Sequence, residues 1–143
     1  MTLQELFNEE QITQLQVAPL DVAVLAAEAD MELEDVELDE LSTQLSTYEG
    51  NALVKELFTA AKSILDEEFE YSIHTSRTNL SNLNEILSSA SKYDECVPEF
   101  KRALLRLAMA IVVVNEEITG TEKTQVEEIA CLLYTSDAAD DSL

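Results

Sequence analysis

The chain has 143 residues, of which 46% are hydrophobic, and a formal net charge of −22 from 30 acidic and 8 basic residues. This length and hydrophobic content suit one globular domain with its own core and exclude an intrinsically disordered chain. The strong negative charge repels phosphate backbones and argues against nucleic-acid binding.

Hydrophobic residues recur at helical spacing along most of the chain. In the first part of the sequence we predict a short helix from Leu3 and a second helix that follows Asn8. Pro19 should end this second helix, because proline breaks a helix interior. A separate alanine-rich helix is then expected over residues 20–30.

An acidic helix is predicted next, ending near Gly50. Its apolar positions are Val36, Leu38, Leu41 and Leu45. Asn51 is then a plausible N-cap for a long helix. The apolar positions of that helix are Leu53, Val54, Leu57, Phe58, Ala61, Ile64 and Leu65.

The second half of the chain continues with helical patterns. Residues 71–82 are the most polar stretch and are expected to form a long loop or a weak helix, with His74 as a loop residue. A helix marked by Leu80, Leu83, Ile86 and Leu87 follows. Pro98 suits the first position of the next helix, which should bury Leu104, Leu107, Ala108 and Ile111. A last helix is predicted to open at Thr119.

Two segments of the chain, residues 23–45 and 108–130, resemble each other at a constant offset of 85 positions. The matching pairs are Asp30 with Asn115, Glu32 with Glu117, Leu33 with Ile118 and Glu37 with Glu122. Each copy reads as a small-residue helix, a polar corner and the opening of an acidic helix. We therefore predict an all-α, compact single-domain bundle of about seven helices, in which two pseudo-repeated helix–turn–helix hairpins related by an approximate two-fold flank a central pair.

The acidic residues of the two corners have a structural explanation. Thr119 and Glu122 fit a capping box, and Glu37 keeps the same place in the first copy. Both glutamates would then stabilise the positive end of a helix dipole. Asp30 and Asn115 suit the turn that ends the preceding helix.

The corners also resemble the tellurite-resistance TerB-like superfamily, whose typical corner reads A-D-G-x-I-x-x-x-E. The corresponding stretches are AEADMELEDVE (Ala27–Glu37) and VVNEEITGTE (Val113–Glu122). The glycine of the family is replaced by Met31 in the first copy and by Glu116 in the second.

This resemblance implies a non-enzymatic, all-α binding domain of the kind that occurs in stress-response systems and beside J-domain co-chaperones. The first function that we predict is protein interaction through the acidic N-terminal half, whose charge should attract a basic protein surface, with a J-domain or stress-system protein as the partner that the resemblance implies. The alternative is binding of a divalent cation at the corners, whose acids the resemblance implies as metal ligands. The candidate metal ligands are Asp30, Glu32, Glu37, Asn115, Glu117 and Glu122. Because these ligands are all oxygen donors, Ca²⁺ or Mg²⁺ would be the cation.

Other sites are disfavoured by the residue pattern. An EF-hand that begins at Asp30 would have Asp35 at its sixth position, where glycine is required. One histidine cannot build the paired Glu-x-x-His motifs of a di-iron site. Cys96 is expected to be an incidental thiol and Glu67/Glu68 solvated surface. No catalytic motif can be assembled, so no enzymatic activity is predicted.

The basic residues are few and appear late, since Lys55 is the first of them. Lys101, Arg102 and Arg106 form a small cluster, for which local pairing with Glu99 and docking onto an acidic surface are both open. No signal peptide or spanning segment is visible, which predicts a cytoplasmic protein without a membrane partner.

Residues 131–143 at the end of the sequence are interpreted as translated adapter DNA and not as part of the native protein. A DNA string that resembles a transposase-based sequencing adapter encodes CLLYTSDAAD, residues 131–140. We therefore expect the helical domain to span residues 1–130 and residues 131–143 to be a non-native tail that contributes little to folding. The alternative is a short flexible native tail, which has the same composition.

Overall fold

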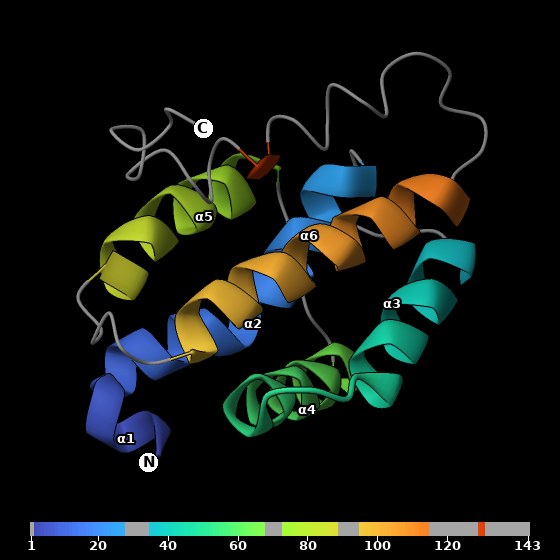
Figure 1. Cartoon of the computed structure of the whole chain (residues 1–143). Coiled ribbons are helices and arrows are strands. Elements are labelled where there is room, and N and C mark those ends of the chain that lie inside the picture. The colour runs from blue at the N-terminus through green and yellow to red at the C-terminus, as the bar shows by residue number, and fades with distance from the viewer. Residues whose placement is uncertain (1, 28–34, 68–72, 89–94, 115–128, 131–143) are drawn as a thin grey trace, which may run out of the picture.

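The computed structural model describes residues 2–27, 35–67, 73–88, 95–114 and 129–130 (Figure 1). These residues form helices and contain no strand, which confirms the all-α prediction. The helices are α1 (Leu3–Leu6), α2 (Glu9–Ala27), α3 (Asp35–Thr47), α4 (Ala52–Asp66), α5 (Ile73–Ser88) and α6 (Cys96–Val114).

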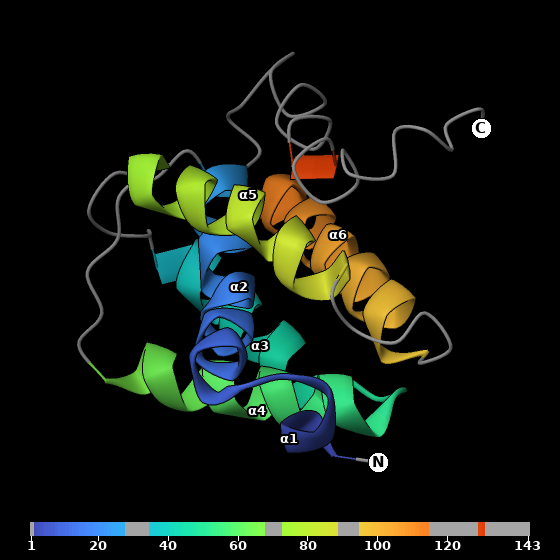
Figure 2. The ribbon, with the colours of Figure 1, turned by 90° about the vertical axis from the view of Figure 1, so that its left-hand side faces the viewer.

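Helix α2 is the centre of the fold. Figure 2 shows it between α4 on one side and α5 and α6 on the other, and it packs against all three. Every residue from Ala18 to Ala27 is buried. The small side chains of this stretch explain why three helices can pack around it, since alanine allows close approach of neighbouring backbones.

Helix α2 also contradicts one prediction, because Pro19 lies inside it and does not end it. An interior proline loses one backbone hydrogen bond and costs roughly 3 kcal/mol. Leu20, Val22 and Leu25, which follow Pro19, are all buried. Full burial of each such side chain contributes roughly 1.5–3 kcal/mol, so packing outweighs the cost of the proline. The two helices expected here are therefore one, so the described residues hold one helix fewer in this region than the sequence predicts.

The helix starts of the first half follow the sequence closely. The Asn8 side chain accepts a hydrogen bond from the backbone N–H of Gln11 at 2.8 Å, and the Gln11 side chain accepts one from the backbone N–H of Asn8 at 3.0 Å. Asn51 caps α4, because its Oδ1 accepts from the N–H of Leu53 at 2.9 Å and of Val54 at 3.2 Å. Both starts were predicted.

Helix α3 packs against α4 and α6 through Leu41 and Leu45, which are buried. Leu38 is partly buried against the same core. Val36 was predicted to join them, but 55% of it is exposed. At 100° per residue Val36 lies on the opposite side of the helix from Leu38, so the two cannot share one buried face.

Helices α5 and α6 complete the core. A long loop or a weak helix was predicted over residues 71–82. From Ile73 onward the loop alternative is wrong, because α5 begins at Ile73 and includes His74. Helix α6 starts two residues before Pro98 and buries the four residues expected, Leu104, Leu107, Ala108 and Ile111. Within the part of the chain that the structure describes, each helix is too short or too polar to cross a bilayer.

Several predictions fall on residues outside the described ranges. These are both polar corners, the helix opening at Thr119 and the tail at 131–143. Ile129 and Ala130 are helical, and Ile129 is completely buried. The internal two-fold therefore stays a prediction, because residues 115–128 of the second copy lie outside the described ranges.

Candidate functional site

Of the six predicted metal ligands, only Glu37 lies among the residues that the structure describes. Asp30, Glu32, Asn115, Glu117 and Glu122 lie outside the described residues. Glu37 lies in the first turn of α3, as its proposed role at a helix start requires. It is only 3% exposed and has an interaction partner, so in this position it does not face water. Among the described residues, no group of three or more His, Cys, Asp or Glu side chains could hold a metal ion.

The outer face of α3 forms an acidic stripe, which we define as Asp35, Val36, Asp39, Glu40 and Thr43. All are exposed except Glu40, which is half-buried. Their spacing of three and four residues places them on one side of the helix. The Glu40 carboxylate accepts a hydrogen bond of 2.6 Å from Gln44 Nε2. Because α3 contains no Lys or Arg, this stripe combines unneutralised carboxylates with one exposed apolar side chain.

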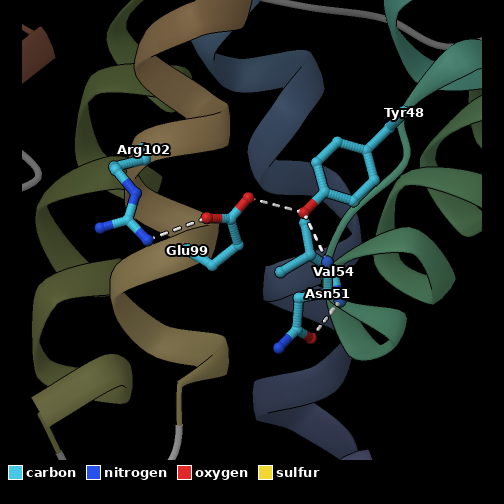
Figure 3. Close-up of polar contacts among 5 residues, drawn as sticks. All are labelled: Tyr48, Asn51, Val54, Glu99 and Arg102. Carbon is cyan, nitrogen blue, oxygen red and sulfur yellow. Dashed lines mark hydrogen bonds and ion pairs between the residues drawn. The ribbon is translucent and has the colours of Figure 1, made fainter.

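A second polar feature lies where α3 turns into α4 (Figure 3). The Tyr48 hydroxyl donates to Glu99 Oε2 of α6 at 2.8 Å and accepts from the backbone N–H of Asn51 at 3.1 Å. Gly50, at φ +157°, makes this turn, and a Cβ on it would lie 2.7 Å from the tyrosine oxygen. The tyrosine therefore ties the α3–α4 corner to the start of α6.

Glu99 is the centre of this arrangement. Its Oε1 accepts from Arg102 at 2.9 Å, which is the local pairing that was one of the two interpretations left open for the basic cluster. The hydrogen bonds from Tyr48 and then from Arg102 hold the pKa of Glu99 below its usual value. Burial, followed by the hydrogen bond to Glu99, raises the pKa of Tyr48. A phenol held protonated and a carboxylate held ionised are poorly suited to proton transfer near neutral pH.

A surface pocket of about 550 Å³ opens beside these residues. It is lined by Gly50, Asn51, Glu95, Pro98, Glu99 and Arg102. Two carboxylates face one guanidinium here, so the lining is negative overall and does not favour an anionic ligand. The Tyr48–Glu99–Arg102 group therefore has a structural role: it fixes α3, which carries the acidic stripe, against α6.

An aspartate of the central helix lies deep in the core. Asp21 of α2 is 2% exposed and faces α5. Its Oδ1 accepts from Ser76 Oγ at 3.0 Å and from Asn79 Nδ2 at 3.4 Å. Its Oδ2 is buried and has no hydrogen-bond partner in the described structure. Burial raises the pKa of this carboxyl from 3.8 to about 7.

Sequence reasoning missed both Tyr48 and Asp21 as polar centres. Tyr48 and Glu99 are 51 positions apart, so no local spacing could join them. Asp21 did carry a signal, because it is the single acid within the apolar run LDVAVLAA of residues 20–27. The Cys96 side chain is buried and has an interaction partner, so it is not an exposed nucleophile.

The described residues thus define an all-α protein with a central buried helix and an acidic outer helix. Comparison with family models, with curated proteins and with solved structures gives no match.

Proposed function

We propose that this protein is a non-enzymatic acidic binding module, similar to the TerB-like stress-response domains, that acts through protein interaction. The observation that carries the proposal is the acidic stripe of α3. Its carboxylates attract a basic partner, and the exposed Val36 offers an apolar contact that a small ion or a polycation would not use. The partner of this chemistry is an amphipathic helix that presents Lys or Arg beside leucine-like side chains.

The resemblance noted above extends this proposal to a J-domain or another stress-system protein as the natural partner. Divalent-cation binding at the corners stays an alternative prediction, because five of its six residues lie outside the described structure. The two functions separate by chemistry: a helical partner needs Val36 and the outer face of α3, whereas a cation needs Asp30 and the other corner oxygens.

The test uses a fluorescent amphipathic lysine–leucine peptide as the probe, with binding measured by anisotropy at physiological salt. Changing Asp35→Lys together with Asp39→Lys should weaken peptide binding about tenfold or more, because both carboxylates would then repel the peptide. The matched control is Glu9→Lys with Glu10→Lys, which changes the net charge equally in the exposed first turn of α2. The control should weaken binding much less.

Two further measurements separate docking from diffuse attraction. Val36→Ser should weaken binding of the amphipathic peptide and leave binding of decalysine unchanged, since only the first uses an apolar contact. If the α3 and α2 charge variants lose affinity equally, or if Val36→Ser has no effect on the amphipathic peptide, the acidic stripe is not the docking surface.

A further inference from the structure

A buried carboxyl group joins the central helix to α5. Asp21 accepts hydrogen bonds from Ser76 and Asn79, and so links α2 to α5 across the core. Both donors are neutral, and the second carboxylate oxygen has no partner among the described residues. A buried carboxylate with one unsatisfied oxygen is costly when ionised and much less so when protonated.

We infer that Asp21 is a protonation-sensitive interlock, which holds α5 against α2 when the carboxyl is neutral and loosens α5 when the carboxyl ionises. The raised pKa of Asp21 would place this change near neutral pH. The contact between α2 and α5 would then weaken over a modest rise in pH, and the change would be confined to α5.

The surroundings of Asp21 contain no compensating charge within the described residues. Burial is the largest cause of its pKa shift, and the two hydrogen bonds oppose it. The charged side chains of α5 that are described, Arg77 and Glu85, are exposed. Those of α4 are exposed or half-buried: Lys55, Glu56, Lys62 and Asp66. The buried ionisable groups on α3 and α6, which are Glu37, Cys96 and Lys101, have interactions of their own.

The direction of the effect follows from proton linkage. The folded protein binds the Asp21 proton more tightly than the unfolded chain, because its pKa is raised from 3.8 to about 7. The stabilisation that protonated Asp21 gives to the folded protein is therefore fully present below about pH 4 and is lost as pH rises towards 7. If α5 detaches by local unfolding, its opening equilibrium should increase up to about tenfold per pH unit in this window.

The first experiment follows the ¹³C shift of the Asp21 carboxyl by NMR in the wild-type protein, which needs no substitution. We expect a midpoint near 7, as burial requires. Ser76→Ala should move this midpoint upward, because the hydrogen bond from Ser76 favours the ionised form. A midpoint near the ordinary value of 3.8 would overturn the proposal, as would a midpoint that Ser76→Ala leaves unchanged.

The second experiment measures amide hydrogen exchange of each helix from pH 5 to 8, corrected for intrinsic exchange. The opening of α5 should increase with pH in the wild type and stay flat in Asp21→Asn. His74→Gln is the matched control, because it removes the one histidine of the sequence, and histidine is the residue type whose ordinary pKa lies in this pH range. The control should keep the wild-type slope. Equal loss of protection in all helices, or a slope that disappears in His74→Gln, would contradict the interlock.

Discussion

At the scale of single residues, the α3–α4 corner depends on the absence of a side chain at Gly50. An alanine Cβ there would lie 2.7 Å from Tyr48 Oη and 3.1 Å from its Cζ. Tyr48 cannot retreat without losing its hydrogen bonds to Glu99 and to the Asn51 backbone. A residue without a side chain is therefore needed at position 50 so that Tyr48 can occupy its place. Tyr48 is needed there because its hydrogen bond to Glu99 attaches the end of α3 to α6.

We predict that Gly50→Ala lowers the free energy of unfolding by about 1–3 kcal/mol, through overpacking and strain. Urea denaturation measures the change. The control is the same substitution in a Tyr48→Phe background, where the clashing oxygen is gone. In that background Gly50→Ala should lower the free energy of unfolding by less. If the effects of the two substitutions on the free energy of unfolding are additive, the two residues do not interact.

A second residue-scale prediction concerns the pH dependence of global stability. Because the pKa of Asp21 is raised to about 7, its ionisation opposes folding at alkaline pH. Asp21→Asn should therefore raise the free energy of unfolding at pH 8 by roughly 1–3 kcal/mol, less than the full linkage value because buried sites relax. Near pH 4, where the wild-type carboxyl is protonated, the gain should be absent. A variant that is less stable at both pH values would contradict this.

At the scale of elements, helix starts carry local information that the sequence shows directly. Asn51 caps α4 by accepting from two backbone N–H groups. Asn51→Ala should lower the free energy of unfolding by about 1 kcal/mol, whereas Asn51→Asp should keep the cap and cost little. Thermal or urea unfolding of the two variants checks this, and equal losses would show that the side-chain oxygen is not the stabilising group.

The elements also show why other features were not predictable. The cap at Asn51 and the helix start after Asn8 depend on residues within four positions, and both were predicted. The pairing of Glu99 with Arg102 is equally local, and it was one of the two interpretations left open for the basic cluster. The continuity of α2 through Pro19 depends on burial among helices distant in sequence, so local rules gave the wrong result. Tyr48 and Asp21 likewise obtain their partners from other helices.

At the scale of the whole molecule, charge is distributed unevenly. No Lys or Arg precedes Lys55, while thirteen acidic residues do. Among those that the structure describes, Asp21 and Glu37 are buried, which leaves fewer carboxylates on the surface than the sequence alone implies. The remaining acids repel one another in the folded state and should make stability depend on ionic strength.

We predict that NaCl stabilises the protein by screening this repulsion, as a rise in melting temperature should show. If the corners bind a cation, millimolar Ca²⁺ or Mg²⁺ should raise the melting temperature beyond NaCl of matched ionic strength. Binding to the folded state alone at a hundredfold excess over Kd adds roughly 2.7 kcal/mol. This increment, and not the salt effect, would then identify a specific site.

The variant Asp30→Asn with Glu37→Gln should remove the divalent-specific increment and keep the response to NaCl. Because Glu37 is buried in the first turn of α3, this variant is also expected to be less stable in the absence of cation. The comparison must therefore use the ion-dependent change within each protein. Glu37→Gln alone is the control for that structural cost. Equal responses of the wild type to Ca²⁺, Mg²⁺ and matched NaCl would exclude the cation function and leave the acidic stripe as the proposed binding surface.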